Sequence, residues 1–343
     1  MCYKNAMTRS WAGGPYLVLA LGVAVVSTAS ILIRYAQAEG VPSLAIAAVR
    51  LALAALILTP IVWMRAGPEL RALRRRDLVL ALFSGVALAI HFWSWIASLA
   101  YTSVASSTVL VTTNPLWVGL ASMLILGERP GRRTVGGIAL TLVGSLFIFA
   151  SDGSQGGSAA LQPDPVRGNL LALLGALAAS AYLLLGRALR PRVGLLVYIW
   201  LAYGTAALVL LLTVGVTGHT LTGYSTLAYV VMIALALGPQ LLGHTAFNWA
   251  LRHVSATFVA ISILGEPIGS ALLALLLFAE RFAPLQLAGF LLILCGIFLA
   301  ARGEGEGGRT RRESASSQEQ GDVHRQDRAH SDDPATGHDP RVP

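Results

Sequence analysis

Ten long apolar runs follow one another along most of the chain, and they constrain its fold more than any other feature. A helix needs about 20 predominantly apolar residues to cross a bilayer, and the runs are close to that length. The predicted spans are residues 16–36, 42–64, 77–98, 104–126, 133–150, 168–188, 194–214, 225–251, 256–278 and 284–301. Almost no run has a polar face, which excludes a bundle of buried helices in a soluble protein. The sequence therefore predicts an all-α polytopic membrane protein with ten transmembrane helices.

Composition and charge agree with this class. Of the 343 residues, 55% are hydrophobic and 12% are charged, whereas soluble domains average about 25% charged residues. The formal net charge of +8 comes largely from short arginine clusters between the apolar runs. Such clusters are typical of membrane loops and do not form a nucleic-acid-binding surface. We therefore expect the lipid bilayer as a partner, and no nucleic acid.

The basic loops predict the orientation of the chain, because loops rich in Lys and Arg stay on the cytoplasmic side. Arginines occur in the loops 65–77, 127–133 and 187–192, at Arg252 and in the tail after residue 301. The loops 99–104 and 215–224 contain no Lys or Arg. This alternation predicts a multi-pass protein of the cell membrane with both termini in the cytoplasm. The polar segment 302–343 is predicted to be a disordered cytoplasmic tail.

The two halves of the chain form an internal repeat. At an offset of 152 residues the matched pairs are Ser103 and Ser255, Pro115 and Pro267, Glu128 and Glu280, Arg129 and Arg281, Gly137 and Gly289, and Gly144 and Gly296. At an offset of 153 they are Gly22 and Gly175, Ser27 and Ser180, and Arg34 and Arg187. Each half, 16–150 and 168–301, holds five spans. Because five is odd, the second half enters the membrane from the opposite side, which predicts two inverted five-helix repeats around a central site.

These motifs resemble the EamA type of the drug/metabolite transporter superfamily. The stretch "ILGERPGRRTVGGIALTLVGSLFIF" fits the pattern of that family, and "LFAERFAPLQLAGFLLILCGIFL" fits with Ala279 in place of the glycine before Glu280. Arg50 in "AAVRLALAALIL" is similar to the family as well. The resemblance covers about residues 16–301. It implies ten helices, a central cavity and the transport, usually export, of small metabolites that include amino acids.

Glu266 is the one acidic residue well inside a predicted span. A buried ionisable group in a membrane is costly and usually faces a cavity, so Glu266 is a candidate for substrate binding and proton coupling. The alternative is a structural glutamate that bonds to a neighbouring helix. Its repeat partner is Asn114, and each is followed by a proline, Pro115 or Pro267, where we expect a helix kink that frees backbone carbonyls.

Further polar residues lie inside other predicted spans. Gln240, His244 and Asn248 follow one another at intervals of four residues, which predicts a polar stripe facing the cavity. Asn248 is also close enough to the cytoplasmic end to be an interface residue. The equivalent helix of the first half carries His91 and Trp95 at the same spacing, and the repeat pairs Trp95 with Phe247. Aromatic rings at these positions could stack on an organic substrate. The alternative for His91 is a core histidine that bonds a neighbouring helix.

Arg50 and Tyr182 complete the predicted site. Arg50 could pair with Glu266 or with a substrate carboxylate, or its long side chain could reach outward to the membrane surface. Tyr182 and Tyr203 are candidate cavity residues. The pairs Glu128 with Arg129 and Glu280 with Arg281 lie at span ends, where helix capping and topology anchoring explain them.

Together the residues and the resemblance predict a secondary transporter that exports small organic metabolites such as amino acids by alternating access. The alternatives are a passive channel or facilitator, and a membrane-embedded enzyme. The sequence contains no nucleotide-binding loop, metal-ligand cluster or nucleophile triad, so no cofactor, metal or enzymatic activity is expected. Oligomeric state, substrate identity and coupling ion stay open.

Overall fold

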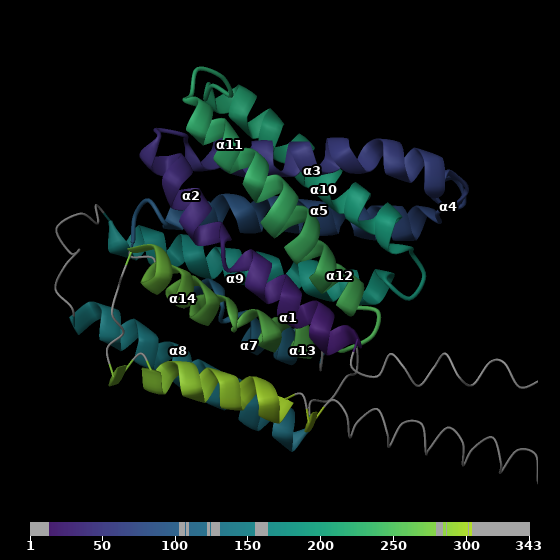
Figure 1. Cartoon of the computed structure of the whole chain (residues 1–343). Coiled ribbons are helices and arrows are strands. Elements are labelled where there is room, and N and C mark those ends of the chain that lie inside the picture. Colours follow the sequence, from purple (N-terminus) through teal and green to yellow (C-terminus); the bar gives the residue numbers. More distant parts are fainter. Residues whose placement is uncertain are drawn as a thin grey trace, which may run out of the picture.

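The computed structural model describes residues 14–102, 107, 110–121, 124, 131–154, 164–278, 284–285, 287–300 and 302–303. Throughout these residues the regular secondary structure is helical (Figure 1). Parts of the predicted span 104–126, the residues Glu128, Arg129, Glu280 and Arg281, and the predicted tail beyond residue 303 lie outside the described residues.

Every predicted span contains at least one helix. The first half comprises α1 (Gly14–Val26), α2 (Ala29–Ala38), α3 (Ser43–Arg65), the short α4 (Gly67–Arg71), α5 (Arg75–Ser98), α7 (Asn114–Ala121) and α8 (Arg132–Ser154). The second comprises α9 (Pro165–Leu189), α10 (Leu195–Thr217), α11 (Thr226–Leu235), the π-helical η3 (Ala236–His244), α12 (Thr245–Ala250), α13 (Ala256–Ile263), α14 (Glu266–Phe278) and a last helix at Leu287–Ala300.

Six stretches of the described chain are long and apolar enough to cross a membrane. They are Gly14–Ala38, Ser43–Arg65, Arg75–Ser98, Val166–Leu189, Leu195–Thr217 and Thr226–Ala250. The helices Ala256–Ser270 and Leu287–Ala300 are also apolar but shorter. The fold is thus that of a multi-pass helical membrane protein.

Two of the predicted spans are interrupted at their prolines. α13 ends at Ile263, and α14 begins at Glu266 after a two-residue turn, so that Pro267 is the second residue of a new helix. In the same way α7 begins at Asn114, with Pro115 second, after a turn at residues 112–113. Proline suits the first turn because the amide hydrogen it lacks would have no helical partner there. At both prolines the structure has the start of a helix in place of the predicted kink.

Contacts at these breaks repeat between the two halves. The Ser27 hydroxyl donates to the backbone oxygen of Glu266 at 3.3 Å, and the Ser180 hydroxyl donates to that of Asn114 at 3.4 Å. The sequence repeat matches Ser27 with Ser180 and Asn114 with Glu266. In each contact the serine belongs to one half and its acceptor to the other, so the first helix of each half packs against the broken helix of its counterpart.

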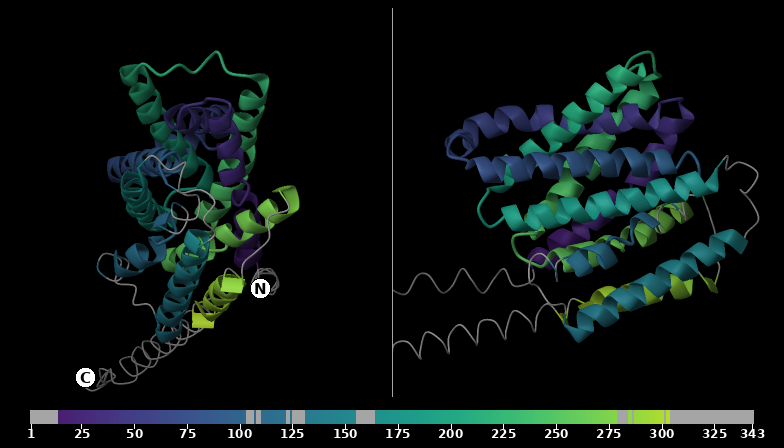
Figure 2. Two further views of the ribbon diagram at one scale, coloured as in Figure 1. Left: turned by 90° about the vertical axis from the view of Figure 1, so that its left-hand side faces the viewer. Right: turned by 180° about the vertical axis from the view of Figure 1, so that it is seen from behind.

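α8 and the helix Leu287–Ala300 lie side by side at one edge of the molecule (Figures 1 and 2). A methyl group added to Gly137 would lie 2.6 Å from the Gly296 oxygen, and one added to Gly144 would lie 2.6 Å from the Gly289 oxygen. The repeat pairs Gly137 with Gly289 and Gly144 with Gly296, so these two contacts are equivalent. Glycines allow this close backbone approach, as is usual for helices in membranes.

The main body is built from long helices that pack lengthwise. α5 lies along α9, and α10 packs against both α3 and α5 (Figure 1). A methyl group added to Gly85 on α5 would lie 2.7 Å from the Ala202 oxygen on α10, which shows how closely these two helices approach. The breaks and the predicted site residues lie among these helices and α1, α7, η3, α12 and α13.

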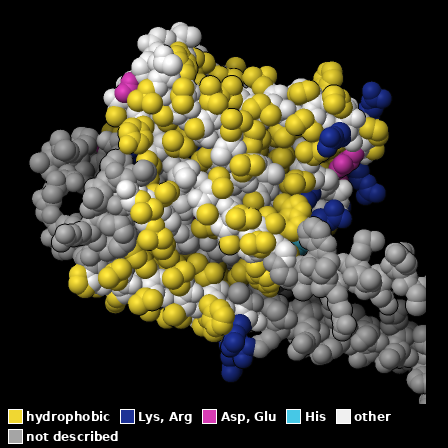
Figure 3. All heavy atoms as spheres, in the orientation of Figure 1, with side chains coloured by type: hydrophobic (Ala, Val, Ile, Leu, Met, Phe, Trp, Pro, Cys, Tyr) yellow, Lys and Arg dark blue, Asp and Glu magenta, His cyan; other side chains and the backbone are white. Residues whose placement is uncertain are grey.

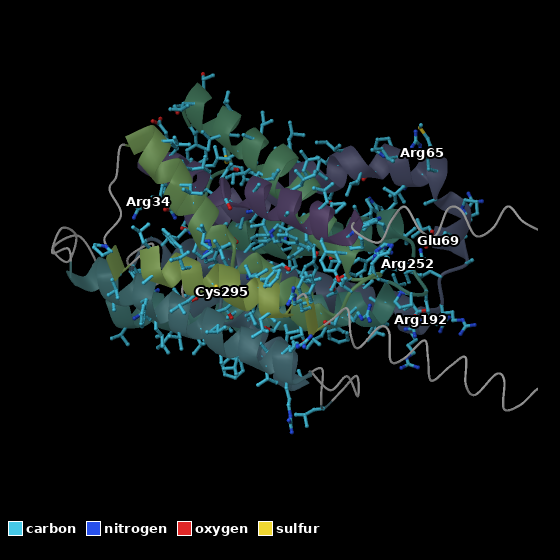
Figure 4. All side chains as sticks on the ribbon, turned by 60° about the horizontal axis from the view of Figure 1, so that its bottom comes forward. Arg34, Arg65, Glu69, Arg192, Arg252 and Cys295 are labelled. Atoms are coloured by element: carbon cyan, nitrogen blue, oxygen red, sulfur yellow. The ribbon has the colours of Figure 1, made fainter. Side chains whose placement is uncertain are left out.

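The surface has the character expected in a bilayer. Apolar side chains cover much of the face in Figure 3, and large apolar residues such as Trp63, Val216 and Leu276 are exposed. Charged groups gather at the ends of the molecule: Arg65, Glu69, Arg192 and Arg252 lie at one end and Arg34 at the other (Figure 4). Three of the arginines assigned to cytoplasmic loops thus share one end.

Candidate functional site

A cavity lies at the level of the two helix breaks. Its empty volume is about 560 Å³, with the open space at its mouth included. Six of the predicted site residues line it: His91 and Trp95 on α5, Asn114 on α7, Tyr182 on α9, His244 at the end of η3 and Glu266 at the start of α14. Both halves of the chain therefore contribute polar side chains to one space.

The remaining wall is mostly apolar and was not predicted, Phe247 apart, which the repeat pairs with Trp95. It consists of Val26, Val111, Thr112, Ala179, Leu183, Phe247 and Ile263. An apolar residue in a lipid-like helix looks the same in the sequence whether it faces lipid, core or cavity. No pattern therefore singles these residues out.

Glu266 and Asn114 occupy equivalent places at the cavity. Each is the first residue of its helix, α14 or α7, and both side chains are buried to more than nine-tenths. The free amide groups of a helix N-terminus carry partial positive charge, which favours an acidic or polar side chain at that position. The break thus places a carboxyl group and an amide group beside the cavity from opposite halves.

His91 bonds a neighbouring helix and lines the cavity at the same time. Its Nδ1 lies 3.0 Å from the Gly175 oxygen, and because a carbonyl only accepts, this nitrogen carries the hydrogen. The imidazole stacks on the Trp95 ring at 6.0 Å between centroids, with 8° between the planes. The structural alternative for His91 and the cavity role are therefore compatible.

His244 belongs to an aromatic cluster between α5 and the η3–α12 junction. Its ring packs edge-on against Phe92 at 5.0 Å and lies 6.5 Å from His91 and 5.6 Å from Phe247, measured between ring centroids. η3 is π-helical, so the predicted stripe of Gln240, His244 and Asn248 is not a regular α-helical face. His244 borders the cavity, whereas Gln240 and Asn248 are fully buried beside it.

Asn248 is held in a hydroxyl network next to the cavity. Its amide nitrogen lies within bonding distance of the Tyr182 and Tyr203 hydroxyls and 2.8 Å from the His244 oxygen. The Tyr203 hydroxyl in turn lies 3.3 Å from that of Thr245. Full burial of Asn248 contradicts the alternative of a membrane-interface residue. Tyr203, the second candidate tyrosine, belongs to this network and does not line the cavity.

Arg190 is a further residue that the sequence did not mark for the site, because it lies in an arginine-rich loop. The side chain is 2% exposed, and its guanidinium donates to the Asn248 and Val193 backbone oxygens. Burial lowers the pKa of Arg190, and the nearby charge of Arg252 adds to this effect. Arg190 thus joins the loop after α9 to the helix that carries Asn248.

Arg50 points into the protein. It is fully buried on α3, its Nε donates to Gln240 Oε1 at 2.8 Å, and its guanidinium lies 4.1 Å from the centroid of the Phe92 ring. The alternative of an outward-reaching arginine is therefore wrong. Gln240 and Phe92 are its direct contacts, and Glu266 is close enough for its charge to act on the guanidinium.

Six buried side-chain polar atoms in the described chain have no hydrogen-bond partner. They are Arg50 Nη1 and Nη2, Trp95 Nε1, Asn114 Oδ1, Gln240 Nε2 and Asn248 Oδ1. All six belong to residues that the sequence placed in the site. Buried polar groups are almost always paired, and a bilayer offers no water to replace a missing partner. These unpaired groups are concentrated at and beside the cavity, which makes this region the candidate site.

An apolar helical bundle built from two repeats, with polar residues of both repeats around one cavity, is an architecture used by membrane transporters. The chain belongs to the EamA-like transporter family, whose model matches residues 14–150 and 166–302. This family is part of the drug/metabolite transporter superfamily.

Two individual proteins are similar to this chain. YetK of Bacillus subtilis (strain 168), described as an uncharacterized transporter, is 23% identical over 297 residues, which make up 83% of this chain and 86% of YetK. A protein of known crystal structure matches with a TM-score of 0.70 at 19% identity, over 86% of this chain and 98% of the other. The second likeness shows the fold alone. Membership of this transporter family and the long apolar helices together establish that the protein is a multi-pass membrane transporter.

Proposed function

We propose that the protein is a secondary transporter that exports small organic metabolites, such as amino acids, by alternating access around the cavity. The observation that carries this proposal is the position of the cavity between two helix breaks, with polar residues from both halves in its wall. Interrupted helices at the interface of two repeats are where secondary transporters bind substrate and coupling ion. The aromatic and polar lining suits a small solute that has both kinds of surface.

The proposed arrangement has ten transmembrane helices in two inverted repeats, residues 16–150 and 168–301, followed by a disordered tail. Both termini lie in the cytoplasm and the protein resides in the cell membrane. The helices found in all ten predicted spans and the exchanged contacts of Ser27 and Ser180 support two equivalent halves. The common end occupied by Arg65, Arg192 and Arg252 supports a single cytoplasmic face.

Within this site we assign substrate contact to the predicted set and proton coupling to Glu266. The substrate-binding set is His91, Trp95, Asn114, Tyr182, His244 and Glu266 at the cavity, with Arg50, Gln240 and Asn248 beside it. A carboxyl group in a mostly apolar wall can exist in either protonation state, which is what coupling to a proton requires.

Efflux measurements test this function. Cells that express the protein and cells that do not are loaded with a panel of metabolites, and release of each solute is followed. We expect faster release of a limited chemical group of solutes from the expressing cells. Purified protein in proteoliposomes then separates a carrier from a pore, because only a carrier shows saturable counterflow. Release without counterflow would assign a channel, and no release of any solute would contradict the proposal.

A further inference from the structure

The most unusual buried charge in the described chain is Arg50. The guanidinium has five N–H groups and no acceptor. One of them, on Nε, is bonded to Gln240 Oε1, while Nη1 and Nη2 are buried and have no hydrogen-bond partner. Phe92 covers one face of the guanidinium at 4.1 Å. The guanidinium is thus held at Nε by Gln240, while the fork formed by Nη1 and Nη2 makes no hydrogen bond.

Gln240 adds a further donor at the same place. Because arginine can only donate, the glutamine oxygen must be the atom that accepts from Nε, which leaves the amide nitrogen as the free group. Gln240 Nε2 is indeed buried and has no hydrogen-bond partner. Three nitrogens that can donate are therefore next to one another. An anion with at least two oxygens is the ligand that matches such a set, since a guanidinium fork binds carboxylates in a bidentate manner.

The cost of this arrangement indicates a role beyond folding. A buried cation without full hydrogen bonding is unfavourable, and an apolar side chain of similar volume is often at least as stable. The stacking on Phe92 and the nearby charge of Glu266 offset part of the cost, but the Nη hydrogens are left without hydrogen-bond partners. A ligand whose oxygens accept hydrogen bonds from the Nη groups explains why the buried Arg50 guanidinium and the Gln240 amide that positions it occur together.

We propose that Arg50 and Gln240 bind the carboxylate of the transported solute, with Arg50 as the binding group and Gln240 as its positioning partner. The inference rests on the transport function proposed above and narrows its substrates to carboxylates, amino acids among them. One aromatic layer, the rings of Phe92 and His244 in edge-on contact at 5.0 Å, separates Arg50 from the cavity. His244 ends the π-helical η3, and π-helical segments are frequent at functional sites. Displacement of the His244 ring is the movement that lets a carboxylate reach the fork.

Matched solutes test the substrate class in the unmodified protein. Proteoliposomes that contain the full chain are assayed for counterflow of phenylalanine, leucine and threonine, each beside its primary amide. The amide keeps the size and the amino group but lacks the negative charge. We expect exchange of at least one acid, and at least tenfold slower exchange of its amide. The free acid without an amino group, 3-phenylpropionate, shows whether the carboxylate alone suffices.

Substitutions of Arg50 and Gln240 test whether these residues recognise the carboxylate. In the double variant Arg50→Met with Gln240→Leu, we expect at least tenfold loss of acid exchange and loss of the thermal stabilisation by the acid, while the melting temperature without solute does not fall. A merely structural role of Arg50 would lower that melting temperature. The single variant Arg50→Lys keeps the charge but lacks the fork, and we expect it to discriminate poorly between acid and amide. Arg65→Met is the matched control, since Arg65 is exposed at the end of the same helix.

The outcomes separate this inference from the proposed function. Equal exchange of acids and amides by the unmodified protein would overturn the carboxylate assignment and leave the transporter intact. Unchanged discrimination in both Arg50 variants would also overturn it. If the efflux panel and these solutes all fail to move, the proposed function itself fails, and the assignment of Arg50 fails with it.

Discussion

At the scale of single residues, the two halves differ in the polar groups that they bring to the cavity. Glu266 and Asn114 are matched by the repeat and have the same place in their helices, yet one is ionisable and the other is not. His91 is matched with Gly243, a position at which a methyl group would clash with the Val26 side chain. The shared residues maintain the fold, and the residues that differ set the chemistry of the site.

Glu266→Gln tests the proposed proton coupling. The substitution keeps the size and polarity of the side chain at the start of α14, so we expect the protein to fold and insert normally. Because an amide does not titrate, transport driven by a pH gradient should fall at least tenfold in proteoliposomes, while solute exchange without a gradient persists. Glu39→Gln, at an exposed acid that follows α2, is the isosteric control. Gradient-driven transport that is unchanged in the Glu266 variant would remove this residue from coupling.

The sequence predicted many of these residues but few of their partners. Rare polar groups in apolar helices, such as Glu266 and His91, stand out without any structure. The bond between Arg50 and Gln240 could not be found, because it joins positions 190 residues apart. Arg190 could not be found either, because its loop has the composition of an ordinary cytoplasmic loop.

At the scale of elements, the breaks in the helices position the candidate site, because they place Glu266 and Asn114 beside the cavity. Pro115 and Pro267 indicated a local disturbance, but a kink and a break have the same sequence signal. The π-helical turn of η3 contains Pro239, which removes a backbone donor, and no pattern of side chains announces its geometry. The positions of the helices along the chain were therefore predictable to a few residues. Which side chains face the cavity near the breaks and near η3 was not.

Close packing of α8 on the helix Leu287–Ala300 leads to a prediction about Gly137. A methyl group there would lie 2.6 Å from the Gly296 oxygen and 3.1 Å from the Ala300 nitrogen, both parts of a rigid backbone. Overpacking of this kind costs about 1–3 kcal/mol, so Gly137→Ala should lower the melting temperature in detergent. The neighbouring Gly136→Ala is the control, because its methyl group would meet the flexible end of Leu299 at 3.2 Å. Equal melting temperatures would show that the two helices are not packed in this way.

At the scale of the whole molecule, two equivalent halves and one charged end determine how the chain sits in the membrane. Of the six described helical stretches that are long and apolar enough to cross a membrane, three belong to each half. Arg65, Arg192 and Arg252 share one end although they lie far apart in the sequence. The loops that follow the second helix of each half, 65–77 and 215–224, are equivalent in the repeat but differ completely in arginine content.

Cysteine labelling tests the inverted arrangement. After replacement of Cys2 and Cys295 by serine, single cysteines are introduced as Ala72→Cys and His219→Cys, both at exposed positions. A membrane-impermeant maleimide should label position 219 in intact cells and position 72 only after permeabilisation, because the arginine-rich loop stays in the cytoplasm. The protein in which both native cysteines are replaced, without an introduced cysteine, serves as the background control. Labelling of both loops from the same side would contradict inverted repeats.

The exchanged contacts of Ser27 and Ser180 have a consequence for the energetics of transport. If inverted halves were identical, each half would adopt in the outward-facing state the conformation that the other half has in the inward-facing state. The two states would then have equal free energy and equal populations. Any resting preference must then come from positions where the halves differ, such as Asn114 against Glu266 and His91 against Gly243. In the double variant Asn114→Glu with Glu266→Asn, the resting population should move toward the opposite face of the membrane.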